Sequence, residues 1–387
     1  MKRSAFLAGT AAAVTSAGGS ALAQTPGPYA QQSIVAVCAP FSGELADFGE
    51  QLRRGALTAC YESNRDATPL DRVFDVRTYD DRNAVATAAL AAQFAINDPT
   101  CFATVGHLTG AITNSVLPYY NNALMPLIVP ASTFDPITSH GYRNVFRLPT
   151  KDSVEGRLFA QALAHDVKPQ LAIALTQDGD YGFEVARGFA DQAHRSGFPA
   201  QIVTFSQEKP AYDKVAHDIV ATKADYVFLA GNSVPMGPIV PALRKAGYQN
   251  SFGASAGFYT TLTLEKYADA LGSASIVSTS MPPVERIPAF NTYVTDMRTR
   301  FGQVTPLMTF GFAAAQLAIA AVKRINSTTR LSLAQALENS APFDGLLGTY
   351  EFSFNGDPID PNLYFYSIEN GAFVYRAAAH PASFIVS

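Results

Sequence analysis

One stretch of sequence, residues 101–133, constrains the fold more than any other part of the chain. It reads CFATVGHLTGAITNSVLPYYNNALMPLIVPAST. This predicts a buried strand at 102–105, a Gly-containing turn, a helix, a second buried strand at 127–129 and a second turn. Two apolar strands joined by a helix form a βαβ unit, and parallel sheets built of such units bind ligands beyond the carboxyl ends of their strands. We therefore expect a small-molecule site at these two turns.

The length and composition indicate a globular protein with two domains. A chain of 387 residues is too long for one ordinary hydrophobic core. Its residues are 48% hydrophobic and 16% charged, and the net charge of −4 leaves no basic surface for a polyanion. We therefore expect no nucleic-acid partner.

The N-terminal residues have the pattern of a secretory signal peptide. Lys2 and Arg3 precede a small apolar run over 5–17, and an Ala-Leu-Ala tripeptide ends at Ala23. We expect residues 1–23 to be removed by cleavage after Ala23. The run is too short, and too interrupted by Gly and Ser, to span a membrane, and no Cys follows directly to carry a lipid. The sequence predicts a soluble periplasmic protein without a membrane anchor.

Three cysteines, Cys38, Cys60 and Cys101, follow the predicted cleavage site. Cys38 lies in an apolar strand and is expected to be a buried thiol. Cys60 and Cys101 are the better candidates for a disulfide in an oxidising compartment, and the sequence leaves their state open. Neither the cysteine spacing nor the surroundings of His107 match a metal site, so we expect no metal and no cofactor.

The rest of the chain continues the alternation of strands and helices. Apolar strands are predicted at 34–39, 171–175, 202–205, 226–230 and 276–279, a strand of alternating apolar and polar residues at 74–79, and a largely apolar helix at 310–325. Continuous apolar strands indicate sheets that helices cover on both faces. Residues 80–83 are expected to cap the helix that follows them, with Val85 on its buried side. Short strands are predicted at 350–354, 363–368 and 373–375.

A set of short motifs, weak alone but specific in their order, points to a family. They are PFSG at 40–43, FG at 48–49, YDD at 79–81, VGHL at 105–108, PAST at 130–133, FR at 146–147, DGDYG at 178–182 and FAA at 312–314. The ordered set resembles the leucine/isoleucine/valine-binding protein family, the type I periplasmic solute receptors of ABC transporters. The resemblance covers residues 33–375.

The resemblance implies an α/β fold with two Rossmann-like parallel-sheet lobes joined by a three-strand hinge. It places one lobe at 33–149 plus 281–362 and the other at 150–280 plus 363–387. Closure around a ligand is a known behaviour of periplasmic binding proteins, and the resemblance implies it for this chain. The implied function is that of a monomeric binding protein, not an enzyme, which passes an amino acid or related small carboxylate to ABC permease subunits.

In the amino-acid binders of this family, two turns of the first lobe hold the carboxylate of the ligand. Thr109, Gly110, Ala131 and Thr133 occupy those turns here. Bare amide hydrogens at a helix N-terminus favour an anion, so the physics agrees with the resemblance. Gly110 stands where the amino-acid binders carry a hydroxyl. Phe48 matches an aromatic wall over the ligand, or alternatively packs against the start of its own helix.

On the second lobe, the resemblance points to Tyr181, Asn232 and Ala256. Tyr181 matches a Tyr that faces the cleft, although ordinary loop packing would also explain it. At Ala256 the branched-chain binders carry the acidic residue that pairs with the ammonium of the ligand. A buried ammonium without a partner is costly. Either Asp178 or Asp180 therefore substitutes, or the ligand lacks an α-amino group. The sequence favours the second alternative slightly, with an aromatic acid as one form of such a ligand.

Two other functions deserve comparison. Residues 253–257 read GASAG, the G-x-S-x-G pattern of an α/β-hydrolase, with Ser255 as nucleophile and Asp357, Asp360 and His380 downstream. The polar segment before this pattern argues against a hydrolase. A ligand-sensing receptor of the same fold, acting on a signalling partner, is the second alternative. The sequence contains no P-loop, which argues against ATP hydrolysis by the chain itself.

Overall fold

The computed structural model describes residues 31–68, 71–178, 180–206, 208–286, 288–339 and 342–379. The predicted signal peptide at 1–23, its cleavage after Ala23 and the residue His380 lie outside these ranges.

The first sheet is parallel and has the strand order β2-β1-β3-β4-β5. Its strands are β1 (Gln31–Ala39), β2 (Arg72–Asp80), β3 (Cys101–Gly106), β4 (Leu127–Val129) and β5 (Val145–Arg147). The helices α1 (Ala46–Asn64), α2 (Val85–Asn97) and α3 (Gly110–Asn122) and the 3₁₀ turn η1 (Asp135–Thr138) connect them. The predicted βαβ unit is confirmed as β3, α3 and β4, with Thr104 paired to Leu127 in parallel register.

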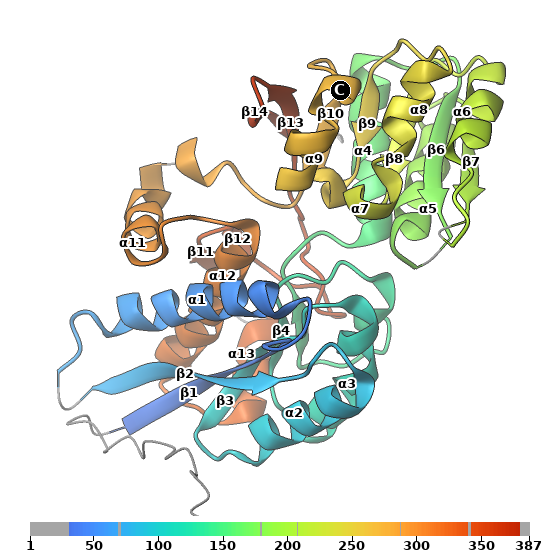
Figure 1. The fold of residues 1–387 in the computed structure, drawn as a ribbon. Coiled ribbons are helices and arrows are strands. Elements are labelled where there is room, and N and C mark those ends of the chain that lie inside the picture. Colours follow the sequence, from blue (N-terminus) through green and yellow to red (C-terminus); the bar gives the residue numbers. More distant parts are fainter. Residues whose placement is uncertain are drawn as a thin grey trace, which may run out of the picture.

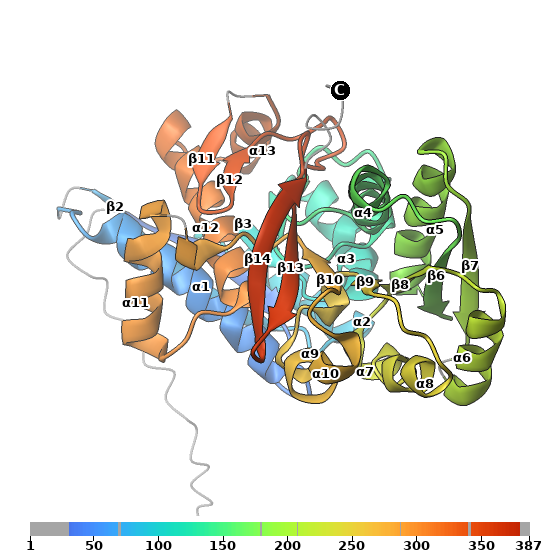
Figure 2. The ribbon, with the colours of Figure 1, turned by 90° about the horizontal axis from the view of Figure 1, so that it is seen from above.

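The second sheet has the order β14-β13-β10-β9-β8-β6-β7. Its parallel strands are β6 (Ala172–Gln177), β7 (Ala200–Phe205), β8 (Tyr226–Ala230), β9 (Phe252–Ala254) and β10 (Ile276–Thr279). The antiparallel strands β13 (Leu363–Glu369) and β14 (Ala372–Ala379) extend it and lie side by side (Figure 2). Its connecting helices are α4 (Asp152–Asp166), α5 (Asp180–Arg195), α6 (Tyr212–Ala221), α7 (Ser233–Met236), α8 (Ile239–Lys245), η2 (Ala256–Phe258), α9 (Thr261–Lys266) and α10 (Ala268–Leu271).

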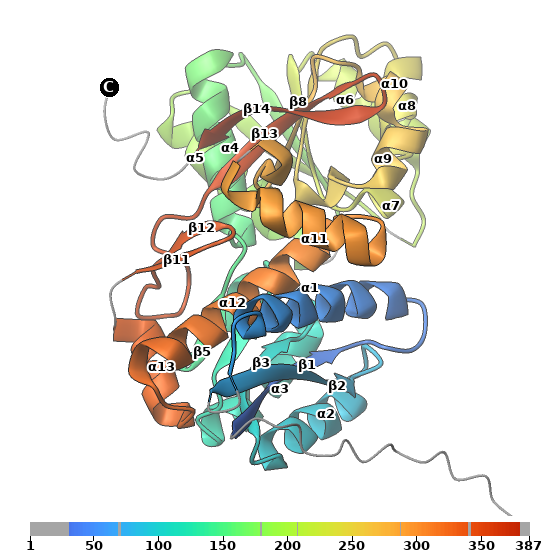
Figure 3. The same cartoon turned by 90° about the vertical axis from the view of Figure 1, so that its left-hand side faces the viewer.

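The chain between β10 and β13 returns to the first sheet. It forms η3 (Val284–Arg286), η4 (Pro288–Phe290), α11 (Asn291–Phe301), α12 (Pro306–Ile325), α13 (Arg330–Asn339) and the small pair β11 (Phe343–Gly345) and β12 (Gly348–Tyr350). The chain therefore passes between the two sheets three times, after β5, after β10 and before β13. These sheets lie in separate bodies (Figures 1 and 3). Parallel sheets in two bodies confirm the α/β fold class.

Thr150 ties the three crossing segments together. Its backbone N–H donates to Ser280 Oγ at 3.0 Å, and its hydroxyl donates to the carbonyl oxygen of Asn362 at 3.0 Å. Because each of these residues belongs to a different crossing, the segments form one hydrogen-bonded connection rather than three independent linkers.

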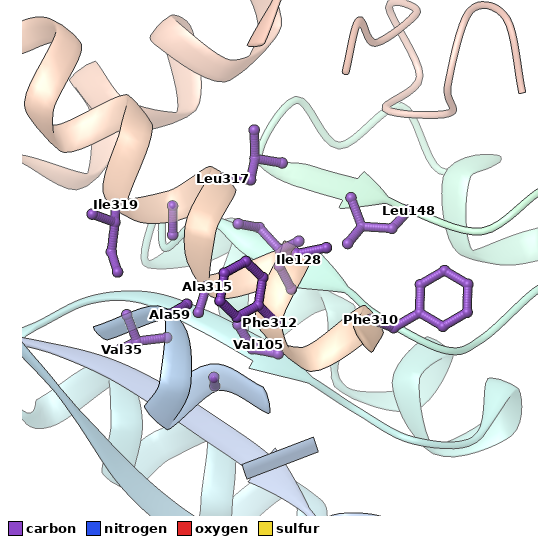
Figure 4. Packing of buried hydrophobic residues seen from close by; sticks show 14 of the residues in the cluster. Val35, Ala59, Val105, Ile128, Leu148, Phe310, Phe312, Ala315, Leu317 and Ile319 are labelled. Atoms are coloured by element: carbon purple, nitrogen blue, oxygen red, sulfur yellow. The ribbon is translucent and has the colours of Figure 1, made fainter. Parts of the chain in front are cut away.

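Helix α12 is the centre of the first hydrophobic core. Figure 4 shows Phe312 and Ala315 of α12 close to Val105 and Ile128 of the sheet, and all four are buried. Among the described residues, α12 is long and apolar enough to cross a membrane, but 72% of its apolar window is buried inside the protein. Its composition is therefore explained by its place in the core.

Two local predictions were wrong. No side-chain hydrogen bond caps α2 at its N-cap Ala84, and Val85 is 58% exposed. Asp81 instead accepts from the N–H of Asn83 and turns its other carboxylate oxygen to His107. The strand predicted at 350–354 ends at Tyr350, because the turn that follows folds back and leaves only an isolated bridge between Phe352 and Pro358.

The crossing of α1 and α12 yields a stability prediction. A Cβ built at Gly55 would lie 2.0 Å from the carbonyl oxygen of Met308. Gly55→Ala is therefore expected to lower the free energy of unfolding by about 1–3 kcal/mol in chemical denaturation. In an uncrowded helix the same change raises stability by up to about 1 kcal/mol. A higher free energy of unfolding for Gly55→Ala than for the wild type would contradict the close contact of α1 with α12 at this position.

Candidate functional site

The carboxyl ends of β3 and β4 form one edge of the candidate site. Helix α3 begins at Gly110, and its N-cap Thr109 makes no side-chain capping bond. The Thr109 hydroxyl donates instead to Asn83 Oδ1 at 2.6 Å. The first amide hydrogens of α3 therefore have no side-chain acceptor, and a helix N-terminus of this kind attracts an anion.

The turns after β3 and β4 touch each other at Gly110. A Cβ at this position would lie 2.6 Å from Phe134 Cβ and 3.2 Å from Ser132 Oγ. There is no room for a side chain, which explains why glycine stands where amino-acid binders of the family carry a hydroxyl. Ala131 and Thr133 are half-buried in the second of these turns.

Phe48 lies in the first turns of α1 and is 43% exposed. Its exposed ring leaves apolar surface available, as an aromatic wall over a ligand requires. The role of Phe48 stays a prediction.

The carboxyl ends of β6, β8 and β9 form the opposite edge, and Tyr181 joins two of its turns. Its phenolic oxygen accepts from the N–H of Gly257 at 3.1 Å and donates to Ser255 Oγ at 3.4 Å. The backbone leaves helical geometry at Tyr181 and has φ +92° at Gly182, where a Cβ would lie 2.5 Å from the carbonyl oxygen of Ala230. This glycine lets Tyr181 reach across to the turn that contains Ala256.

Asn232 completes this second edge. It is exposed, and a Cβ at Gly257 would lie 2.7 Å from its Oδ1 atom. The structure therefore brings Tyr181, Asn232 and Ala256 together at one edge. The residues Thr109, Gly110, Ala131 and Thr133 gather at the other.

Two further acidic residues, Asp152 and Glu155, lie in the first turn of α4 and were not among the predicted site residues. The backbone N–H of Asp152 donates to the carbonyl oxygen of Thr133 at 3.0 Å. The Oε1 atom of Glu155 accepts from the N–H of Ala256 at 2.7 Å and from Ser278 Oγ at 2.7 Å. This turn therefore contacts both edges of the candidate site. The available signal was a pair of acids three residues apart, directly after the first crossing segment.

Both carboxyl groups are almost completely buried, with 1% exposure for Asp152 and 2% for Glu155. Burial raises the pKa of each to about 7. The Thr133 hydroxyl acts to lower the pKa of Asp152, but it forms no hydrogen bond of ordinary geometry with the carboxylate. Among the described residues, neither oxygen of Asp152 has a hydrogen-bond partner.

His107 is buried inside the first body. Its Nδ1 atom lies 2.6 Å from Asp81 Oδ2, and its Nε2 atom lies 3.0 Å from the hydroxyl of Tyr120. All three side chains are buried. This buried network holds the turn before α3 from the side of the hydrophobic core.

The hydrolase alternative is not supported by the surroundings of Ser255. The strand before this serine, β9, has only the three residues Phe252–Ala254, and the polar residues 248–251 lie outside it. Ser255 is fully buried, and its Oγ donates to the carbonyl oxygen and accepts from the N–H of Gly231. Asp357 is paired with Arg147 and Lys151 in the first body. Ser255 therefore braces two turns.

The three cysteines are free and buried. Cys60 and Cys101, the pair considered for a disulfide, are not joined in this structure. Burial raises the pKa of Cys38 to about 12, so this thiol stays protonated.

Comparison with known proteins identifies the class of protein. A periplasmic binding protein family matches residues 32–372, and the chain therefore belongs to that family. The Leu/Ile/Val-binding protein homolog 3 of Brucella melitensis is 22% identical over 345 residues, which are 88% of this chain and 92% of that protein. The resemblance to the leucine/isoleucine/valine-binding proteins is thus confirmed.

Solved structures show the same fold. A leucine-binding protein from Thermotoga maritima has a TM-score of 0.78 at 21% identity, covering 91% of this chain and 99% of that one. A solute-binding protein of an ABC transporter from R. palustris, in complex with benzoate, has a TM-score of 0.74 at 20% identity, covering 90% and 96%. The fold is that of the type I periplasmic binding proteins.

The buried carboxyl of Asp152 yields a pH prediction. Its folded-state pKa of about 7 lies above the ordinary 3.8, so the folded protein keeps this proton to higher pH than the unfolded chain. The stability it contributes is therefore fully present below about pH 4 and lost as the pH rises through 7. Asp152→Asn cannot ionise and should be more stable than the wild type at pH 8, by up to about 4 kcal/mol.

Thermal unfolding at pH 4 and pH 8 measures this effect. Asp166→Asn is the control, because its side chain is 72% exposed, and it should change stability little at either pH. Equal stability of Asp152→Asn and the wild type at pH 8 would contradict the claim that the Asp152 carboxylate is buried without a hydrogen-bond partner.

Proposed function

We propose that this chain is an extracytoplasmic solute-binding protein of an ABC importer. It would capture a small carboxylate, such as an amino acid or an aromatic acid, between the two edges of the candidate site. The observation that carries the proposal is the N-terminus of α3, which no side chain caps and which lies beside the turn of Thr133. Membership in the periplasmic binding protein family and the relatives named above support it.

The proposed binding energy has two sources. The amide hydrogens of α3 and the Thr133 hydroxyl would hold the carboxylate, aided by the helix dipole. Phe48 and Tyr181 would cover apolar surface of the ligand, and removing apolar surface from water contributes about 25 cal/mol per Å². An affinity near 1 μM corresponds to about −8 kcal/mol.

The proposed cycle uses the two bodies as lobes, at 33–149 plus 281–362 and at 150–280 plus 363–387. The crossings tied by Thr150 would serve as the hinge, and closure would bring Thr133 and Tyr181 to opposite sides of one ligand. The N-terminal pattern supports export to the periplasm, and the family supports delivery to permease subunits. The bracing role of Ser255 supports binding without catalysis.

A thermal-shift screen of the mature chain tests the proposed function. The ligands are amino acids, aromatic acids, dicarboxylates and, as uncharged controls, the corresponding amides. At least one carboxylate should raise the Tm by several degrees at saturating concentration, because a ligand that binds only the folded state stabilises it. The matching amide should not. Stabilisation by amides alone would contradict an anion site at α3.

Two substitutions locate the site. Thr133→Ala and Tyr181→Ala should each weaken binding of the best carboxylate about tenfold or more in calorimetric titration, because each removes a hydrogen bond or an aromatic contact. Circular dichroism should show that both variants remain folded. Tyr119→Ala, on an exposed part of α3, is the control and should bind as the wild type does. Wild-type affinity in both Thr133→Ala and Tyr181→Ala would contradict the proposed location of the site.

A further inference from the structure

The face of the first body formed by α2 and α3 carries almost no charge. Between Asn83 and Phe134 the sequence has a single Asp, Glu, Lys or Arg residue, Asp98, although 16% of the whole chain is charged. Helices α2 and α3 both fall in this stretch and pack beside each other (Figure 1). The side chain of Asp98 is only 11% exposed and is paired with Arg77. A helix with one side in solvent normally carries charged residues there, so two neighbouring helices without them need an explanation.

Helix α2 also exposes a row of apolar side chains. Leu90 is 51% exposed and Phe94 is 62% exposed, and Ala86 is exposed one turn before Leu90. These three residues, which we call the α2 ridge, are spaced four apart and therefore form one ridge along the helix. The opposite side of α2, with Ala88 and Ala92, is buried in the core. Exposed apolar and aromatic side chains without charges are typical of the centre of a protein–protein interface.

The α2 ridge lies away from the second body. Figures 1 and 3 show α2 on the face of the first sheet opposite to α1, and the buried residues of the two helices belong to separate hydrophobic clusters. The candidate site lies at the carboxyl ends of the strands, whereas the ridge lies on the outside of the sheet. A contact at the ridge therefore leaves the second body free to move.

The order of side-chain sizes along the ridge favours a second copy of this chain as the partner. Leu90 is in the middle, with the small Ala86 on one side and the large Phe94 at equal spacing on the other. If two α2 helices pack antiparallel about a two-fold axis at Leu90, Ala86 of each copy lies against Phe94 of the other. The ring then fills the space beside the alanine at both ends. Antiparallel packing also sets the N-terminus of each helix dipole beside the C-terminus of the other.

The absence of charge points to the same partner. A two-fold axis brings each residue near its own copy, so a charged residue close to the axis would meet a like charge. A face recognised by an oppositely charged protein would instead carry a charge of its own. Self-association is therefore the contact for which an uncharged ridge is suited.

The size of the face predicts a weak contact. Helices α2 and α3 have 13 residues each. Each is therefore about 20 Å long and about 10 Å wide, and together they offer a footprint of roughly 400 Å² per copy. A standard stable interface buries about 800 Å² per partner. We therefore expect an association that depends on protein concentration.

We propose that the α2 ridge is a homodimer contact, in which two copies of the chain pack their α2 helices antiparallel about a two-fold axis at Leu90. The inference goes beyond the proposed function and does not depend on the ligand. It replaces the monomer that the family resemblance implies.

Sedimentation velocity of the mature chain at concentrations from about 1 to about 200 μM tests the proposal, because this range covers weak contacts. The wild type should shift from monomer to dimer as the concentration rises. Leu90→Glu and Leu90→Lys should each weaken the association about tenfold or more, because each sets like charges against each other at the axis. An equimolar mixture of the two variants should associate again, since opposite charges then meet at Leu90.

The matched controls are Leu331→Glu and Leu331→Lys. Leu331 is 46% exposed on α13, in the same body but away from the α2 ridge. Both controls should associate as the wild type does. Circular dichroism should show that all four variants are folded.

Disulfide trapping tests the axis without adding charge. Helix axes about 8–10 Å apart bring facing Cα atoms within the range of about 4.4–6.8 Å that a disulfide spans. Leu90→Cys should therefore form a covalent dimer under mild oxidation, and Leu331→Cys should not. The three native cysteines are buried and do not compete.

Three results would overturn the proposal. One is a wild type that sediments as a monomer at every concentration, and the second is an association that both charged variants at Leu90 leave unchanged. The third is a mixture of Leu90→Glu and Leu90→Lys that stays monomeric, together with Leu90→Cys that forms no covalent dimer. None of these measurements uses a ligand, so their outcome is independent of the proposed function.

Discussion

The first turn of α4 is the point on which the arrangement of the site depends. A parallel sheet ends its strands at one edge, so each sheet here offers a row of turns, but two such rows in separate bodies need not face each other. The bonds from Asp152 to Thr133 and from Ala256 to Glu155 connect one row to the other through a single helical turn. Both edges are therefore hydrogen-bonded to the same element, the first turn of α4.

The two edges are held by packed cores rather than by their own turns. Close contact of α1 with α12 at Gly55 and Gly311 fixes the helix that follows β1 against the first sheet. The buried network of Asp81, His107 and Tyr120 fixes the turn before α3. Backbone groups supported in this way are preorganised for a ligand, which reduces the entropy lost on binding.

Much of the fold could be predicted because its strands are short apolar runs bounded by turns. The unit of β3, α3 and β4 was readable from residues 101–133 alone, and the ordered motifs extended the interpretation to the whole chain. Helix caps were less predictable: the acids at 80–81 use their carboxylates on other partners, and Val85 faces solvent. A local sequence does not reveal these competing partners.

Some residues of the candidate site could likewise be predicted from the sequence, and others could not. Residues at strand ends, such as Thr133 and Tyr181, could be assigned to the candidate site from the family resemblance, because their motifs match those of the family. Asp152 and Glu155 could not, because in sequence they are ordinary acids at a helix start, where the helix dipole favours them. Only the tertiary structure shows that they are buried and that both contact the turns of the site. Glu155 is 101 residues from Ala256 in the sequence, so the residues next to Ala256 carry no sign of this contact.

The most direct test of this account is a crystal structure of the mature chain with the acid that stabilises it most. The account predicts electron density for this molecule between the turns of Thr109 and Thr133 on one side and the turn of Tyr181 on the other, with its carboxylate at the N-terminus of α3. Density for the same molecule at any other surface, with these turns left in contact with solvent, would contradict it.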